Sequence, residues 1–353
     1  MKYLKFGIHN KKYFQSFPKT RMINILNSKI SSKEKFPESR YNPEKLDKEK
    51  QKLKLVDRFP ETIQLYLKLG RYDRPVGSML LFWPCTWGLT LGAPGLSILY
   101  FKCMALYFSG SVLMRSSGCI INDMWDKDID SKVIRSKDRP LANNKITYKQ
   151  ASIFLSGHLA ISLWILLQLP LNSIVAGLGV MPIVCIYPYM KRVTYFPQFF
   201  LGLAFNSGII VGLASISGVI PIDVAIPLYS AGIIWTLIYD TVYAHMDKED
   251  DKKIDVKSTA IYFGDKSKYY FVIFTIIMMY LFHIAIRNSN KDGKLSRYRL
   301  VTYGLLVIGF LFQLNSIYKV NFKSPLSCLK HFKANSWFGL IIFLACFASL
   351  LDK

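Results

Sequence analysis

The feature that most limits the fold of this chain is a series of long apolar segments. A helix that spans a bilayer needs about 20 mostly apolar residues, and nine windows of roughly this kind, poor in charge, follow residue 74. They lie at residues 75–93, 96–121, 153–169, 173–189, 196–220, 224–239, 269–286, 300–317 and 337–351. Lipid admits only helices or closed barrels, and these runs lack the alternation of barrel strands. The sequence therefore predicts an all-α, polytopic membrane protein with nine transmembrane helices.

Lys and Arg are unevenly distributed over the connections between these segments. They are frequent after the second, fourth, sixth and eighth segments and absent after the third and fifth. Under the positive-inside rule, the amino terminus and the even-numbered connections lie on the cytoplasm-like side of the membrane. The connection at residues 287–299 is basic although this topology places it on the opposite side. Because the overall bias sets the orientation, the predicted topology stands.

The first 58 residues carry much of the net charge of +23. They hold 16 Lys and Arg against 6 Asp and Glu, and residues 1–33 contain no acidic side chain. This composition predicts a mitochondrial presequence and polar linker over residues 1–58, followed by a membrane domain over residues 59–353. A disordered basic tail on a plasma-membrane protein is the alternative. Nucleic acid is not an expected partner, because the excess charge is concentrated in this segment.

Acidic side chains gather directly after the second apolar segment, in INDMWDKDID at residues 121–130. If one helix continues through this stretch, its spacing of about 100° per residue places four polar side chains on one face. These are Asn122, Asp123, Asp126 and Asp130, whereas Asp128 points away. Arg115 lies on the same face, two turns deeper. An ionisable residue inside a membrane segment is a functional candidate.

A second acidic stretch, YDTVYAHMDKEDD at residues 239–251, follows the sixth apolar segment. The same helical spacing places Asp240, Tyr243, Asp247 and Asp251 on one face. One acidic run after a membrane helix is typical of a solvated loop, but two runs in matching phase on one side favour a site. Facing carboxylates favour Mg²⁺, and the adjacent Arg and Lys side chains favour a diphosphate. Because the site borders an apolar bundle, a substrate with a long lipid tail is expected.

Both acidic stretches carry a specific resemblance. NDMWDKDID matches the NDxxDxxxD signature of the UbiA superfamily of intramembrane prenyltransferases, and YDTVYAHMDKEDD matches its second motif, YDxxYxxxDxxxD. The segments RYDRPVGSMLLFWPCTWGL, RSKDRPLANNKIT, YPYMKRVTYFPQFFLGLAFNSG and KSTAIYFG also resemble family segments, so that residues 71–265 are covered. Within the superfamily, the sequence is most similar to the 4-hydroxybenzoate polyprenyltransferases of ubiquinone synthesis. The resemblance implies nine helices around a central cavity, which a polar cap covers.

The resemblance also implies an activity. It is the transfer of a polyprenyl chain from polyprenyl diphosphate to carbon 3 of 4-hydroxybenzoate, with Mg²⁺ as cofactor. The expected location is the mitochondrial inner membrane with the active-site cap on the matrix side, and a ubiquinone-synthesis complex is a candidate partner. Homogentisate, a naphthoate or haem is the alternative acceptor within the superfamily. A cation carrier or channel is the alternative outside it, but it would place charge deep in several helices.

The matching positions imply roles for individual residues. The expected metal ligands are Asn122, Asp126, Asp130, Asp247 and Asp251. The expected catalytic residues are Asp123, Asp126, Asp240, Asp247 and Tyr243. Arg135, Arg139, Lys191, Arg192 and Lys257 are expected to hold the diphosphate, and Arg71, Arg74 or Arg115 the carboxylate of the aromatic acceptor. Asn144 departs from the Gly that the family has after RPL. Asn tolerates a left-handed backbone, so the turn is expected to persist.

Overall fold

Helices are the only regular elements in the part of the chain that the structure describes. The structure is a computed structural model that describes residues 55–131, 136–253, 256–290 and 296–353. All of these residues belong to one compact unit, Leu53–Lys353, and none of them forms a strand. The all-α prediction is therefore confirmed for the described residues. Nearly all of the predicted presequence and linker, residues 1–58, lies outside them.

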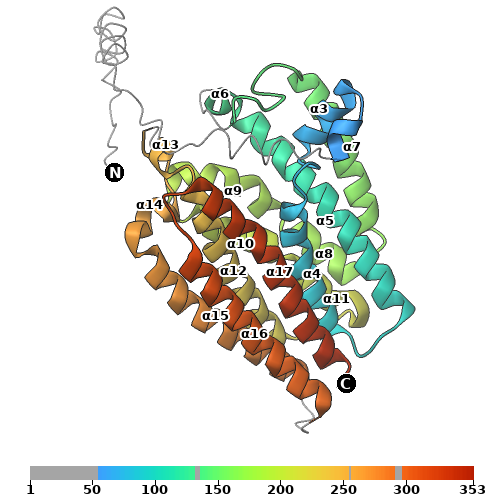
Figure 1. The fold of residues 1–353 in the computed structure, drawn as a ribbon. Helices are drawn as coiled ribbons and strands as arrows, with labels where there is room; N and C mark the ends of the chain where they lie inside the picture. The colour runs from blue at the N-terminus through green and yellow to red at the C-terminus, as the bar shows by residue number, and fades with distance from the viewer. Residues whose placement is uncertain (1–54, 132–135, 254–255, 291–295) are drawn as a thin grey trace, which may run out of the picture. The chain divides into compact units, whose positions relative to one another are not determined.

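The helices follow one another with short connections (Figure 1). In chain order they are η2 (Leu55–Arg58), α3 (Glu61–Leu69), α4 (Val76–Gly92), α5 (Ile98–Trp125), α6 (Lys127–Asp130), α7 (Tyr148–Leu166), α8 (Leu171–Gly179), α9 (Met181–Val193), α10 (Pro197–Asn206), α11 (Gly208–Ser217), α12 (Ile222–Ala244), α13 (Lys248–Lys253), α14 (Thr259–Phe263), η3 (Gly264–Lys266), α15 (Ser267–Ser289), α16 (Arg297–Lys319) and α17 (Pro325–Leu350). Several begin at a Ser or Thr cap. Thr147, for example, forms a capping box with Gln150, which satisfies amide groups that the first turn leaves unpaired.

Seven helical stretches of the described chain are long and apolar enough to cross a membrane. They are Ile98–Trp125, Leu171–Val193, Pro197–Ser217, Ile222–Ala244, Thr259–Ser289, Arg297–Lys319 and Pro325–Leu350. The other two predicted windows are also helical, but α4 has only 17 residues and α7 is not among the stretches that meet this criterion. The structure thus supports a polytopic membrane protein, and the number of nine spans stays a prediction.

Close backbone contact joins α4 and α11. A Cβ atom at Gly88 would lie 2.2 Å from the carbonyl oxygen of Ile209, and one at Gly212 would lie 2.5 Å from the carbonyl oxygen of Cys85. Small residues at such crossings let two membrane helices approach until their backbones touch. The glycines therefore allow α4 to pack directly against α11, which comes from the middle of the chain.

Aromatic side chains fill the centre of the bundle and join its two halves. The ring of Trp87 on α4 lies 5.1 Å from that of Trp235 on α12 and 5.3 Å from that of Phe282 on α15. Each indole has a hydrogen-bond acceptor on α17: Trp87 donates to the carbonyl oxygen of Gly339 and Trp235 to the side chain of Asn335. Buried indoles need such partners. The contacts set the position of α12, which carries the second acidic motif.

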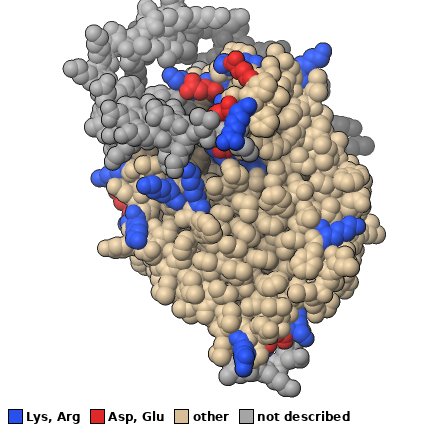
Figure 2. Space-filling model, turned by 45° about the vertical axis from the view of Figure 1, so that its right-hand side comes forward, with Lys and Arg blue, Asp and Glu red and all other residues tan. Residues whose placement is uncertain are grey.

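Charge is concentrated at the two ends of the unit. On the face drawn in Figure 2, Lys, Arg, Asp and Glu gather at the upper and lower ends, and the belt between them is almost uncharged. In Figure 1, α6 and α13 lie toward one end, and the end of α15 and the start of α16 lie at the other. This distribution is what a bilayer-spanning bundle requires, because charges inside lipid are costly. The end with α6 and α13 is called the motif end below.

Candidate active site at the motif end

The first acidic motif lies at the end of α5 and in α6. The stretch is not one continuous helix, because α5 ends at Trp125 and α6 begins at Lys127. The amides of Asp126 and Asp130 still donate to carbonyl oxygens four residues earlier, at 2.9 and 2.8 Å. Since these bonds preserve the helical phase, three carboxylates are buried together. They belong to Asp123, Asp126 and Asp130, whereas Asp128 is exposed and Asn122 is half-buried.

Each buried carboxylate of this motif is paired with a cation from another part of the chain. Arg71, before α4, donates from Nη2 to both oxygens of Asp123, at 2.7 and 2.8 Å. Arg139, after α6, bridges Asp123 at 3.0 Å and Asp130 at 2.5 Å. Lys191, in the last turn of α9, pairs with Asp126. Three residues predicted to bind substrate therefore neutralise the motif carboxylates, as buried charges require.

Arg71 occupies an unusual backbone position. Its φ is 60°, in the left-handed region that a non-glycine residue enters only at a cost of about 1–3 kcal/mol. The contacts of its side chain hold it there, because Nη1 donates to the carbonyl oxygen of Lys68 at 2.8 Å while Nη2 contacts Asp123. Strain at a residue that clamps a buried carboxylate is typical of a functional site.

A second residue with a left-handed backbone, Asn144, lies in the turn that carries Arg139. Asn144 has a φ of 60°, so the prediction that Asn preserves this turn is confirmed. The amide of Asn144 donates to Leu141, and that of Asn143 to Arg139. Leu141 packs in a small apolar cluster with Leu69 and Ile120. The cluster fixes the turn against α3 and α5 and thereby positions the guanidinium of Arg139 over the motif.

The surroundings of Asp130, the last carboxylate of the first motif, change its pKa. Burial raises the pKa of Asp130, and the guanidinium of Arg139 opposes this shift. The neighbouring carboxylates of Asp123 and Asp126 raise it further, because like charges disfavour ionisation. A divalent cation at this place would relieve the same repulsion.

The second acidic motif lies at the end of α12 and the start of α13. Asp240 and Tyr243 are in the last turns of α12, and Asp247 and Asp251 lie at and within the start of α13. All four are half-buried. The ring of Tyr243 packs 4.7 Å from that of Phe332 on α17, so this residue has a packing role whatever its contact with substrate.

Arg115 and Tyr187 connect the two motifs. Both lie deep in the protein yet keep some accessible surface, as does Asp240. Arg115 packs against Gly77 and over the ring of Phe205, and it is an electrostatic neighbour of Asp240. Tyr187 is in turn a neighbour of Arg115, Asp240 and Asp126. No sequence signal singles out Tyr187, although it lies in the segment YPYMKR four residues before Lys191.

The remaining predicted cations have different surroundings. The amide of Lys257 donates to the carbonyl oxygen of Lys191 at 2.9 Å, which joins the connection after α13 to the end of α9. Arg192 lines a pocket of about 200 Å³ together with Asp126 and Trp125. Arg74 is mostly exposed and pairs with the adjacent Asp73, at 3.3 Å. Arg135 lies outside the described residues.

The described carboxylates do not form a complete metal site by themselves. No group of three or more His, Cys, Asp or Glu side chains in the described parts of the chain could hold a metal ion alone. Mg²⁺ commonly binds through one or two carboxylates, waters and substrate phosphates. The oxygen donors of the two motifs fit such a shared site, since they are hard ligands beside an anion-binding set of cations.

Fold and site together define a helical membrane protein with an ionic site at one end of an apolar bundle. The model of the UbiA prenyltransferase family matches residues 81–339, and the chain belongs to this family. It is 42% identical over 293 residues to the mitochondrial 4-hydroxybenzoate polyprenyltransferase of Drosophila pseudoobscura pseudoobscura, covering 82% of this chain and 71% of the relative. The human protein of the same name is 41% identical, over 82% of this chain and 76% of that protein.

Solved structures show the same fold. A UbiA homolog from Archaeoglobus fulgidus bound to GPP and Mg²⁺ aligns with a TM-score of 0.60 at 20% identity, covering 81% of this chain and 99% of that chain. A UbiA homolog from Aeropyrum pernix K1 aligns with a TM-score of 0.60 at 18% identity, covering 78% and 97%. The predicted membership of the UbiA superfamily is confirmed.

Proposed function

We propose that this protein transfers a polyprenyl chain from polyprenyl diphosphate to carbon 3 of 4-hydroxybenzoate in ubiquinone biosynthesis. The observation that carries the reaction class is the meeting of two acidic motifs with Arg115, Tyr187 and Lys191 at one end of an apolar bundle. The choice of acceptor is supported by relatives about 40% identical over most of the chain that are named 4-hydroxybenzoate polyprenyltransferases. No described contact favours homogentisate, naphthoate or haem.

The diphosphate and Mg²⁺ are assigned to the motif end. Asn122, Asp126, Asp130, Asp247 and Asp251 are the proposed metal ligands. Bound Mg²⁺ would supply positive charge that stabilises the departing diphosphate. In the structure, Arg139 and Lys191 pair with the carboxylates of the first motif. With these carboxylates bound to metal, both cations would be available to diphosphate oxygens, together with Arg192, Lys257 and Arg135.

Arg115 is the proposed partner of the acceptor carboxylate. Arg71 is occupied by Asp123, and Arg74 is exposed, whereas Arg115 lies deep between Gly77 and Phe205 and keeps accessible surface. An ion pair with Arg115 would bring the ring of the acceptor close to Asp240, its electrostatic neighbour. Asp240 is thus the proposed acceptor of the ring proton, and Asp123 holds Arg71 and Arg139 in place.

Apolar surroundings complete the mechanism. Cleavage of the allylic carbon–oxygen bond produces a carbocation that water would capture as an alcohol, and the apolar helices around the site exclude water. The electron-rich carbon 3 of the phenol then forms the new bond. Deep residues with accessible surface, such as Arg115 and Tyr187, support the proposed central cavity under a polar cap.

The proposed location is the mitochondrial inner membrane, with the motif end on the matrix side. Relatives named as mitochondrial and the basic, acid-poor first 33 residues support this location. The proposed organisation is a presequence and linker over residues 1–58 and a nine-span membrane domain over residues 59–353. Other enzymes of ubiquinone synthesis in the same membrane are the proposed partners.

Membranes that contain the full chain, labelled 4-hydroxybenzoate and a polyprenyl diphosphate provide the test. We expect prenylated product with Mg²⁺ and none after chelation, and no competition by unlabelled homogentisate. Asp247→Asn and Asp126→Asn should each lower the rate by at least ~10³-fold, because each removes a charge from the metal site. The control is Asp128→Asn, since Asp128 is exposed. Product without a divalent metal, or an Asp247→Asn variant as active as the parent, would refute the assignment.

A further inference from the structure

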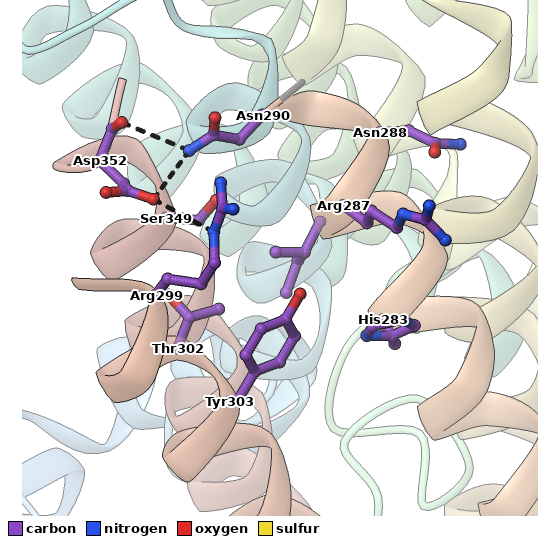
Figure 3. A pocket seen from close by; sticks show the side chains of 10 residues that line it. His283, Arg287, Asn288, Asn290, Arg299, Thr302, Tyr303, Ser349 and Asp352 are labelled. Carbon is purple, nitrogen blue, oxygen red and sulfur yellow. Dashed lines mark hydrogen bonds and ion pairs between the residues drawn. The ribbon is translucent and has the colours of Figure 1, made fainter. Parts of the chain in front are cut away.

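A pocket of about 610 Å³ lies between the end of α15, the start of α16 and the end of α17, at the end of the bundle away from the acidic motifs (Figures 1 and 3). Arg287 and Arg299, the first and last residues of the basic connection 287–299, line this pocket. This is the connection whose charge departs from the positive-inside pattern. Among the residues that the structure describes, the pocket lining includes Arg287 and Arg299 and one carboxylate, that of Asp352. The charge of these described lining residues is therefore positive.

The single carboxylate in this pocket is already satisfied. Asp352 accepts a hydrogen bond from Asn290 at 3.1 Å and contacts Nε of Arg299 at 3.5 Å (Figure 3). It also accepts from the hydroxyl of Ser296. Asp352 therefore neutralises Arg299 and presents no free oxygen set for a metal cation. A cation is not the ligand that this chemistry selects.

Three donors that line the pocket have no partner within the described residues. They are the guanidinium of Arg287, the imidazole of His283 and the hydroxyl of Tyr303. His283 and Arg287 are four residues apart on α15, so they share one face of the helix. The ring of Tyr303 on α16 lies 5.5 Å from that of His283. Two neighbouring helices thus contribute one cationic and two polar side chains to the lining of this pocket, and the guanidinium of Arg287 lies on the side away from Tyr303 (Figure 3).

We propose that this pocket binds the phosphate group of an anionic phospholipid in the leaflet opposite the motif end. A phosphodiester carries one negative charge, which matches the guanidinium of Arg287, for which the described residues provide no ion-pair partner, and Arg is well suited to phosphate oxygens. The adjoining helix surfaces expose apolar side chains, including Tyr280 and Val301, which can contact acyl chains. Basic pockets between membrane helices bind phosphate-bearing headgroups on the matrix or cytoplasmic side of membranes, and the same pairing of guanidinium with phosphate applies in the opposite leaflet. This also accounts for the basic connection on the unexpected side.

Native mass spectrometry of the full chain in detergent tests the proposal, with phosphatidylglycerol and phosphatidylcholine as the two lipid probes. We expect the parent to retain phosphatidylglycerol about tenfold more strongly. Arg287→Ala should weaken its binding by about 10-fold or more, because a charge-assisted hydrogen bond contributes about 1.5–3 kcal/mol. Tyr303→Phe, which keeps the ring, should weaken it by a few fold. Arg287 is exposed, so its removal is compatible with folding.

Arg297→Ala is the matched control, because Arg297 is an exposed cation at the same end that does not line the pocket. It should change retention by less than twofold. Equal retention by the parent and Arg287→Ala, or an equal loss in Arg297→Ala, would overturn the proposal. A third arm adds inorganic phosphate at millimolar concentration. Full displacement of the lipid by phosphate would assign the pocket to free phosphate and overturn the lipid assignment.

Discussion

The carboxylates at the two charged ends of the bundle have different partners. At the motif end, three buried carboxylates pair with three cations, and a metal and a diphosphate are the proposed replacements for these partners. At the other end, Asp352 is held by three groups of its own pocket while Arg287 has no described partner. The comparison teaches that the two ends differ in how far their cations are neutralised. Balanced carboxylate–cation pairs would suit a metal together with a diphosphate, and a cation without a described partner would suit a single phosphate.

The ends also differ in how they are assembled. The cations of the first motif come from 52, 16 and 65 residues away, so the site exists only when several helices have packed. The donors of the opposite pocket lie one turn apart on α15 and on the following helix. We therefore expect the motif end to be more sensitive to substitution.

Substitution of one Arg by Ala at each end is expected to give the largest difference in the rate of prenyl transfer. Arg139→Ala removes a guanidinium that bridges Asp123 and Asp130. Asp123 keeps Arg71, but the buried carboxylate of Asp130 loses its cation, which is strongly unfavourable. We expect at least ~100-fold slower prenyl transfer in detergent, with partial recovery in Arg139→Lys. Arg287→Ala should retain the parent rate within twofold in the same assay. If both Ala variants lose activity alike, the two ends form one functional unit and the comparison fails.

Substitution of the strained Arg71 tests the importance of paired geometry at the motif end. Arg71→Lys keeps the charge but loses the guanidinium that contacts both oxygens of Asp123. A buried carboxylate with a weakened partner costs about 1–3 kcal/mol, so the melting temperature should fall by about 3–6 °C. Arg74→Lys, whose Arg is exposed, should stay within about 1 °C of the parent. A similar decrease in both variants would show that the clamp on Asp123 is unimportant.

The smallest expected effect concerns pH at the opposite end. Burial lowers the pKa of Lys353 to about 8, where its amine donates to the carbonyl oxygens of Leu91 and Ala93. Between that pKa and the usual value near 10.4, the unfolded chain binds more protons, so this residue makes the protein more stable as pH rises. We expect the parent to gain about 1–3 °C in melting temperature relative to Lys353→Met between pH 8 and 10. A constant difference would contradict this.

Local patterns predicted much of the motif end. Helical phase separated the exposed Asp128 from the buried carboxylates, although the helix is interrupted at Asp126, because hydrogen bonds across the interruption preserve the phase. The left-handed Asn144 followed from the tolerance of Asn for that backbone. The pairing of Arg71 with Asp123 did not follow, since nothing local indicates which distant carboxylate a cation will meet. Tyr187 and the opposite pocket were missed for the same reason.

The sequence by itself determined the class of fold and the family, because apolar length, charge asymmetry and two spaced acidic motifs are local properties of the chain. Tertiary structure decided which cation neutralises which carboxylate, how deep Arg115 and Tyr187 lie, and that Arg287, His283 and Tyr303 line one pocket. These are properties of helix packing. Close glycine contacts such as Gly88 against Ile209 set the distances between segments far apart in the sequence. Electrostatic interactions depend on those distances.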